Sequence, residues 1–203
     1  PFVCCIVDDA STDGEQQVIK DYLKDHFNLS DIAVAYQKEA DYANIIYAQH
    51  EENKNCYFAV LLLKENLYSK NEGYKKYGYI AEWRDFCEYE AMCEGDDYWT
   101  NKNKLQQQMN YMGNNPDCSL IYTDFDILYE SSGRKLPSVF KNKYRKPSMS
   151  FVEHLMRRAY IGPCTWLYKK CVLDDYMSNC NDSFVDGTFA MALDTFATSQ
   201  VYY

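Results

Sequence analysis

Short apolar runs of strand type alternate with helical patterns along most of this 203-residue chain. Phe2–Val7 and Cys56–Leu63 are compact apolar runs, and a helical pattern over residues 15–27 separates the first run from later strands. Farther along, Leu105, Met109 and Met112 have helical spacing. Such alternation predicts an α/β fold with a largely parallel sheet. Further strands are expected at Ile32–Tyr36, Tyr89–Cys93, Ser119–Thr123, Cys164–Tyr168 and Val201–Tyr203, and helices at Ile80–Phe86, Ser150–Arg158 and Phe184–Thr198. Residues 130–148 are expected to form a loop.

Charge and cysteine usage narrow the class of protein. The formal net charge of −9 argues against a nucleic-acid binder, which must neutralise phosphates with Lys and Arg. Nine cysteines without Cys-x-x-Cys spacing argue against a structural zinc site. Their odd number and apolar surroundings predict reduced thiols in a cytoplasmic protein. The longest apolar stretch, Tyr57–Leu63, is far shorter than the ~20 residues of a membrane span.

Two acidic pairs follow predicted strands. Asp8-Asp9 ends the first strand, and Glu94-Gly95-Asp96-Asp97 follows the run Tyr89–Cys93. Ligands of parallel sheets bind beyond the carboxyl ends of the strands. Mg²⁺ and Mn²⁺ prefer oxygen ligands and usually take one or two carboxylates from the protein, with substrate phosphates completing the shell. The pattern therefore predicts a metal-dependent enzyme acting on a nucleotide diphosphate.

The same residues resemble the family 2 glycosyltransferases. The segment Ile6-Val7-Asp8-Asp9-Ala10-Ser11-Thr12-Asp13-Gly14 is similar to the family's first nucleotide-binding signature. The segment Cys93-Glu94-Gly95-Asp96-Asp97-Tyr98-Trp99, followed by Lys104-Leu105-Gln106 and Asn115-Pro116-Asp117, is similar to the second. The resemblance implies a GT-A fold, which is one Rossmann-like α/β domain with a largely parallel twisted sheet flanked by helices. It also implies a UDP-sugar donor and Mn²⁺ or Mg²⁺.

Residue roles follow from this resemblance position by position. Asp9 matches the aspartate that contacts the uracil, and Asp8 would shape the nucleoside pocket with Ser11 nearby. Asp96 matches the residue near the ribose and sugar, where it would also assist the metal, and Asp97 matches the metal ligand. Lys64, just past a strand, is placed on the donor side. Each acidic pair also has a structural explanation, as a helix cap or as a solvated turn.

The predicted reaction is sugar transfer to an acceptor hydroxyl with inversion at the anomeric carbon. One carboxylate suffices to deprotonate the acceptor, and Asp186 falls where the family places this base. Asp194 is its main competitor on the same predicted helix, and Asp186 is otherwise an ordinary helix-start residue. Thr165, Trp166 and Trp99 are assigned to the acceptor side, although core packing explains the two tryptophans equally well.

The chain also departs from the family pattern. It begins on what would be the second strand and stops at Tyr203, so we expect a single glycosyltransferase-like domain over 1–203 that is incomplete at both ends. Residues 1–123 would bind the nucleotide-sugar and 124–203 the acceptor, a carbohydrate or lipid-linked glycan. Peripheral association with the inner face of the cell membrane is a further expectation. Two alternatives stay open: a sugar nucleotidyltransferase and a non-catalytic nucleotide- or glycan-binding module.

Overall fold

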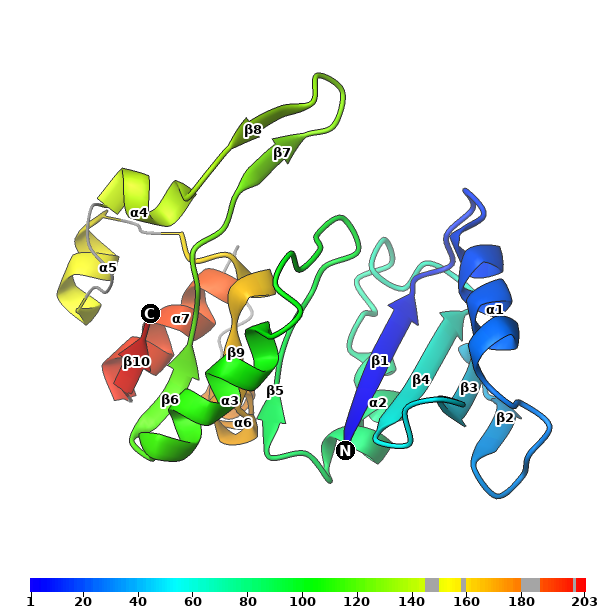
Figure 1. Cartoon of the computed structure of the whole chain (residues 1–203). Helices are drawn as coiled ribbons and strands as arrows, with labels where there is room; N and C mark the ends of the chain where they lie inside the picture. The colour runs from blue at the N-terminus through cyan, green and yellow to red at the C-terminus, as the bar shows by residue number, and fades with distance from the viewer. Residues whose placement is uncertain (145–149, 158–159, 180–186, 199) are drawn as a thin grey trace. The chain divides into compact units, whose positions relative to one another are not determined.

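The computed structural model describes residues 1–144, 150–157, 160–179, 187–198 and 200–203 (Figure 1). The chain divides into two compact units, Pro1–Phe86 and Cys87–Tyr203. The sequence predicts one domain over residues 1–203, with a nucleotide-sugar part that ends at residue 123 and an acceptor part after it. That division stays a prediction. We describe each unit by itself.

The first unit is built on a four-stranded sheet with the order β1-β4-β3-β2. Its strands are β1 (Phe2–Asp8), β2 (Ala35–Glu39), β3 (Ala43–Gln49) and β4 (Cys56–Leu63), and its helices are α1 (Glu15–His26) and α2 (Lys75–Arg84). β1 and β4 run parallel, with Asp8 opposite Leu62 at their carboxyl ends. β3 is antiparallel to both β2 and β4.

Strand β4 supplies the centre of this unit because its side chains alternate between two buried faces. Val60 and Leu62 pack in one cluster with Leu23 of α1 and with Phe27. Leu61 and its neighbours on the opposite face pack in another cluster with Trp83 of α2. The sheet is therefore covered on both faces, which fits the nearly continuous apolar sequence of β4.

The second unit has its own four-stranded sheet, with the order β10-β6-β9-β5. The strands are β5 (Tyr89–Glu90), β6 (Cys118–Ile121), β9 (Leu167–Lys169) and β10 (Gln200–Tyr202). The longer helices are α3 (Lys104–Asn114), α6 (Lys170–Asn179) and α7 (Gly187–Thr198). A two-stranded sheet of β7 (Ile127–Tyr129) and β8 (Arg134–Leu136), the short helices α4 (Val139–Tyr144) and α5 (Phe151–Arg157), and the 3₁₀ turn η1 (Pro163–Thr165) complete it.

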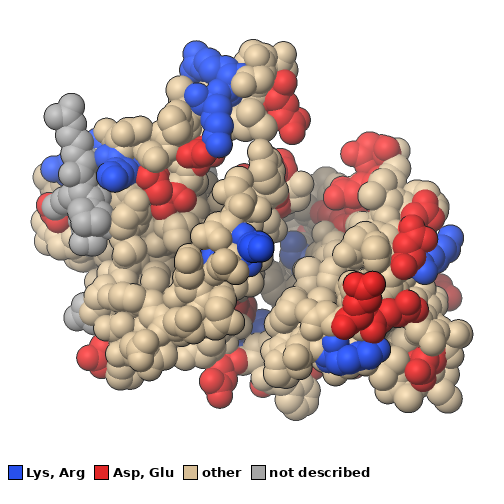
Figure 2. Space-filling view, viewed as in Figure 1, with Lys and Arg blue, Asp and Glu red and all other residues tan. Residues whose placement is uncertain are grey.

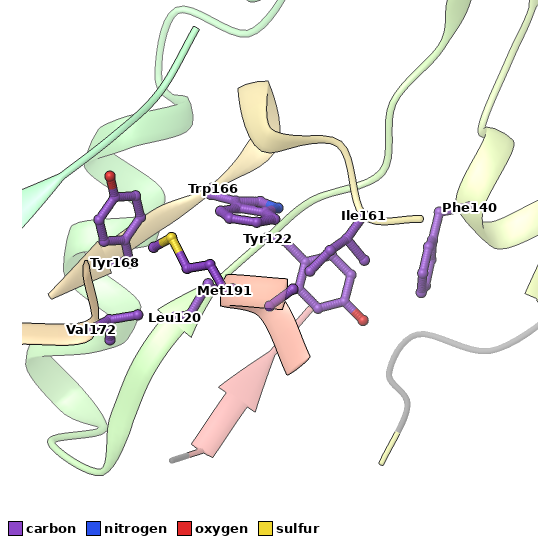
Figure 3. Close-up of a cluster of buried hydrophobic side chains, with 9 residues drawn as sticks. Leu120, Tyr122, Phe140, Ile161, Trp166, Tyr168, Val172 and Met191 are labelled. Atoms are coloured by element: carbon purple, nitrogen blue, oxygen red, sulfur yellow. The ribbon is translucent and has the colours of Figure 1, made fainter. Parts of the chain in front are cut away.

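Aromatic side chains dominate the core of the second unit (Figure 3). Trp166, Tyr122 and Tyr168 are all buried and lie in one cluster with Leu120 of β6 and Met191 of α7. Large aromatic rings contribute much apolar area per residue, so this unit builds a core although its strands have only two to four residues.

The expected GT-A architecture is wrong for this structure. In place of one large, largely parallel twisted sheet, the structure has sheets of four, four and two strands, and most of the strand pairs are antiparallel. The parallel pairs are β1 with β4 and β10 with β6. The physical reason is local: the connection between β2 and β3 is too short for a crossover, and such connections join antiparallel strands.

Several individual elements agree with the sequence. β4 and α3 occupy the expected positions, and α5 and α7 begin within a few residues of the expected helices. The expected loop at residues 130–148 is wrong over its described part, which contains β8, the end of the β7–β8 hairpin and α4. In the described part of the chain, no helix has the length and apolar composition to cross a membrane.

Candidate functional site

In the first unit, the candidate site lies at the carboxyl ends of β1 and β4. The side chain of Asp8, the last residue of β1, is 4% exposed. One of its oxygens, Oδ1, accepts a hydrogen bond from the backbone N–H of Ser11 at 3.2 Å and another from the side-chain amide of Gln16. The second oxygen, Oδ2, is buried without a hydrogen-bond partner among the described residues.

An orphaned carboxylate oxygen in a buried position is costly to the fold. A buried acceptor without a partner loses about 1–3 kcal/mol, and more when it is charged. Native proteins keep such groups mainly where a ligand or an ordered water completes them. Asp8 Oδ2 is therefore a buried acceptor whose hydrogen bond a ligand donor or an ordered water would supply.

Asp9 has a different environment. Its Oδ1 accepts the backbone N–H of Leu67 at 2.8 Å, and its Oδ2 accepts the backbone N–H of Tyr68 at 3.0 Å. The carboxylate thus ties the end of β1 to the loop that follows β4. This contact is structural, and it leaves each oxygen with a further lone pair for the uracil contact that the sequence predicts.

The backbone between Asp9 and helix α1 is strained at one position. Ala10 has a φ of 61°, in the left-handed region where a Cβ atom is unfavourable. Gly14, at the N-terminus of α1, has a φ of 97° and meets no such penalty. Strained residues persist where the surroundings fix them and are frequent at binding sites. Ala10 directly follows both candidate carboxylates.

The other two residues predicted on the donor side have partners within the first unit. Ser11 donates its hydroxyl to Glu15 Oε2 at 3.3 Å. The ammonium of Lys64 lies 2.8 Å from Glu39 Oε1, and this hydrogen bond lowers the pKa of the Glu39 carboxyl. An exposed pair of this kind contributes little to stability, so Lys64 can exchange Glu39 for a ligand phosphate at small cost.

In the second unit, the candidate site is the carboxylate loop, which we define as residues 94–99. All six residues are exposed. Its turn is closed by the backbone N–H of Asp97, which donates to the carbonyl of Glu94 at 3.1 Å. Asp96 and Asp97 are thus exposed residues of a closed turn, and the Asp97 side chain also interacts with the thiol of Cys164.

The carboxylate loop is anchored by contacts with the turn η1 and the start of α3. Trp99 donates its Nε1–H to the carbonyl of Cys164 at 2.7 Å. The ring of Trp99 lies 4.4 Å from the ammonium of Lys104, which also donates to the carbonyl of Trp166 at 3.4 Å. Burial lowers the pKa of Lys104 to about 8. Lys104 is a residue of this site to which sequence analysis assigned no role.

Two cysteines border the same loop and are unreactive at neutral pH. Burial raises the pKa of the Cys164 thiol to about 12, and a hydrogen bond from this thiol to Asp97 contributes to the shift. Burial and the charge of Asp97 also raise the pKa of Cys93, whose thiol lies 3.5 Å from the carbonyl oxygen of Asp97. Thiolates are the reactive form of cysteine, so these residues support the loop and do not act as nucleophiles.

The carboxylate loop offers two adjacent carboxylates, Asp96 and Asp97, to a divalent metal. The described residues contain no group of three or more His, Cys, Asp or Glu side chains placed to hold a metal ion. Mg²⁺ sites commonly use one or two carboxylates together with substrate phosphates. Asp96 and Asp97 fit that arrangement, in which the ion arrives with a phosphorylated ligand.

The residues predicted on the acceptor side lie at different depths. Trp99 is 39% exposed, whereas Trp166 and Thr165 are buried. Thr165 donates its hydroxyl to the carbonyl of Gly162 at 2.7 Å, and Trp166 packs in the aromatic core. Of these three residues, Trp99 is thus the one whose side chain is exposed and can contact a sugar. The predicted base Asp186 lies outside the described residues, and its competitor Asp194 is half-buried on α7.

Comparisons with known proteins give relatives but no function. Uncharacterized proteins of Mycobacterium bovis and of two strains of Mycobacterium tuberculosis are each 31% identical to the chain over 83 residues. This match covers 41% of the chain and 23% of each relative, so the matched part of the chain corresponds to about a quarter of their length. No family model and no solved structure matches the chain.

Proposed function

We propose that this chain binds a nucleotide-sugar, with UDP as the nucleotide, and transfers the sugar to an acceptor hydroxyl with the help of Mn²⁺ or Mg²⁺. The observation that carries the proposal is the buried Asp8 carboxylate, which has one oxygen without a partner among the described residues. Asp8 belongs to the sequence signature that resembles the nucleotide-binding signature of family 2 glycosyltransferases. The proposal concerns activity and ligands, and it does not depend on a GT-A fold.

A nucleoside suits the environment of Asp8. The ring N–H of uracil and the ribose hydroxyls are neutral hydrogen-bond donors, which a buried carboxylate accepts strongly because the bond is charge-assisted. An anionic phosphate at the same position would instead be repelled by the carboxylate. Asp8 and Asp9 of the first unit therefore favour a nucleoside over a diphosphate as their ligand.

The carboxylate loop of the second unit, taken by itself, suits a diphosphate that is bound through a metal ion. Asp96 and Asp97 are exposed, acidic and adjacent in the sequence. Without a cation they would repel a diphosphate, so binding of the donor at this loop requires the metal. When bound, the ion would stabilise the charge that develops on the leaving diphosphate.

The remaining chemical task is removal of the proton from the acceptor hydroxyl. A carboxylate placed within hydrogen-bond distance of that hydroxyl is sufficient. We assign this role to Asp186 on the sequence resemblance. Trp99, with its exposed indole ring, is the residue that we assign to contact with a sugar.

Paired variants test the two carboxylate sites separately. Asp8→Asn keeps the size of the side chain and removes the charge, so we expect at least tenfold weaker UDP binding in the presence of Mn²⁺. Asp97→Asn should also weaken binding at least tenfold, but only when the metal is present. Asp25→Asn on α1 and Asp175→Asn on α6 change exposed carboxylates and serve as matched controls. Unchanged UDP affinity in both test variants would contradict the proposal.

A turnover assay tests the catalytic assignment. We expect Asp186→Asn to abolish release of UDP from a panel of UDP-hexoses in the presence of a glycan acceptor, while UDP affinity stays within twofold of the unaltered chain. Asp194→Asn is the matched comparison on α7. Loss of turnover in Asp194→Asn together with full turnover in Asp186→Asn would move the base to Asp194.

A further inference from the structure

The β7–β8 hairpin is an exposed element of the second unit. Each of its strands has three residues, and all six side chains are exposed. Isolated two-stranded hairpins are marginally stable in water. This hairpin is held at its base, where Asp126 accepts the backbone N–H of Ser138 at 2.8 Å and pairs with Lys135 at 2.6 Å.

The same carboxylate-rich base joins the hairpin to helix α4. Asp124 accepts the backbone N–H of Phe140 at 2.8 Å, and Phe125 accepts the backbone N–H of Val139 at 2.8 Å. The side chain of Phe140 is buried in the aromatic core. Hairpin and helix are therefore one structural module, which we call the basic hairpin module and define as residues 127–143.

Exposed apolar side chains occupy both faces of the hairpin. The strand register places Ile127 opposite Leu136 and Leu128 opposite Lys135. Because successive side chains of a strand point to opposite faces, Ile127 and Leu136 lie on one face and Leu128 lies on the other. The exposed fractions of these three side chains are between 36% and 42%. The flat surface of a protein partner would cover only one of these faces, whereas a lipid interface into which the hairpin inserts would cover both.

The basic hairpin module is positively charged in an acidic chain. Residues 127–143 contain four Lys and Arg and one Glu, whereas the whole chain has a net charge of −9. Figure 2 shows Lys and Arg side chains gathered on the hairpin and over the region of α4. Lys135 pairs with Asp126, and Arg134 and Lys141 are further exposed cations of the module.

Arg134 makes a cation–π contact with a tyrosine of the hairpin. The guanidinium of Arg134 lies 4.8 Å from the ring of Tyr129 on the same face of the hairpin. Tyr and Trp side chains are enriched at membrane–water interfaces, and Arg and Lys extend their charged groups from apolar surroundings toward the headgroups. Basic residues beside apolar ones are the combination that binds anionic lipid surfaces.

We propose that the basic hairpin module is a docking surface for a membrane that contains anionic lipids. Leu128, Ile127 and Leu136 enter the interface, and Arg134 and Lys141 contact the headgroups. This association is peripheral and is independent of the glycosyl-transfer proposal. The acidic remainder of the chain would be repelled by the same surface, so the charge distribution also sets which part of the chain faces the lipid.

Co-sedimentation of the full chain with lipid vesicles tests the proposal. We expect binding to vesicles of phosphatidylcholine mixed with phosphatidylglycerol, little binding to phosphatidylcholine alone, and loss of binding in 0.5 M salt. The double variant Arg134→Glu/Lys141→Glu should bind at least tenfold more weakly. Lys38→Glu/Lys54→Glu changes the net charge equally on exposed residues of the first unit and should bind as the unaltered chain does.

A second pair of variants tests how much the apolar side chains contribute to vesicle binding, because these substitutions leave the net charge unchanged. Leu128→Ser/Leu136→Ser should weaken vesicle binding at least tenfold. Val18→Ser/Ile32→Ser is the matched control, because these residues of the first unit are 70% and 95% exposed. Equal thermal unfolding midpoints would show that each variant is folded. Absence of vesicle binding, equal binding to neutral vesicles, equal losses in the control variants, or binding of a soluble polyanion in place of vesicles would overturn the proposal.

Discussion

The two acidic pairs of this chain have opposite environments. Asp8 and Asp9 are held within the first unit by hydrogen bonds from backbone and side-chain groups. Asp96 and Asp97 are exposed on the carboxylate loop of the second unit. Identical residues thus serve different purposes: a fixed carboxylate is a preorganised acceptor for a specific donor group, whereas an exposed carboxylate is available to a cation. We therefore expect substitutions in the two pairs to change the free energy of unfolding by different amounts.

The largest difference that we expect in the free energy of unfolding is between a variant of Asp9 and a variant of Asp97. Asp9→Ala leaves two backbone N–H groups without their acceptor, one of them from the buried Leu67. We expect a loss of about 3 kcal/mol in the free energy of unfolding. Asp97→Ala removes an exposed side chain that accepts a hydrogen bond from the Cys164 thiol, and it should lower the free energy of unfolding by less than about 1 kcal/mol. Urea unfolding of both variants measures the difference, and equal losses would show that the contrast between the pairs is false.

Lys104 extends the comparison to a buried charge beside the carboxylate loop. Its pKa is lowered to about 8, so the unfolded chain binds more protons between pH 8 and about 10.5, and stability rises with pH in that window. Lys104→Met removes the buried charge and should stabilise the chain by about 2 kcal/mol at pH 7. The gain should shrink at pH 9.5. Lys102→Met, at an exposed residue, is the control. If Lys104→Met instead destabilises the chain, the contacts of Lys104 stabilise the fold by more than the burial of its charge costs.

His154 is a buried group of the second unit that has no hydrogen-bond partner among the described residues. It lies between the rings of Phe189 and Phe196, and burial lowers its pKa to about 4. The unfolded chain therefore binds more protons below pH 6.5, so stability falls as the pH decreases. We expect a loss of about 1 kcal/mol between pH 6.5 and 5. His154→Phe should reduce this slope, and an unchanged slope would contradict the assignment.

Ala10 gives the smallest expected effect and tests the strain beside Asp8 and Asp9. Ala10→Gly relieves the left-handed backbone but adds flexibility to the unfolded chain, so we expect a net stabilisation of about 0.5 kcal/mol. Ala33→Gly, at a residue without positive φ, should destabilise the chain. A destabilised Ala10→Gly would show that the backbone at this position is not strained. Thermal unfolding of the two variants provides the comparison.

Sequence patterns predicted the continuous apolar elements well. β4 has the expected bounds because it is a continuous apolar run, six of whose eight residues are buried on the two faces of a sheet. Strand β3 was missed because Asn44, Tyr47 and Gln49 interrupt its apolar character. The hairpin β7–β8 was missed for a related reason: its strands are short and exposed, so they carry no buried periodicity.

Strand direction was the part of the fold that the sequence predicted wrongly. Alternating strands and helices suggested parallel pairing, but β2 and β3 are joined by a tight connection and pair antiparallel. In the second unit, β9 pairs with both β5 and β6 in antiparallel fashion. These pairings join segments far apart in the sequence, and no local pattern specifies their direction.

Sequence patterns name the residues of the candidate site, whose roles stay predictions, but they do not give the contacts of these residues. The motifs identified Asp8, Asp9 and the carboxylate loop, whereas the roles of Lys104 and Gln108 could not be read from apolar spacing. These two polar residues lie on the buried face of α3 with Met112, while Met109, which the helical pattern counted as apolar, is 37% exposed. Their burial depends on the carbonyls of Trp166 and Thr165, which accept their hydrogen bonds.

Isothermal titration of UDP into the unaltered chain tests the central claim most directly. We predict saturable one-site binding in the presence of Mn²⁺ and at least tenfold weaker binding after the metal is removed with EDTA. Equal affinity in both conditions would contradict the metal role of the carboxylate loop. No binding of UDP in either condition would contradict the proposed donor site as a whole.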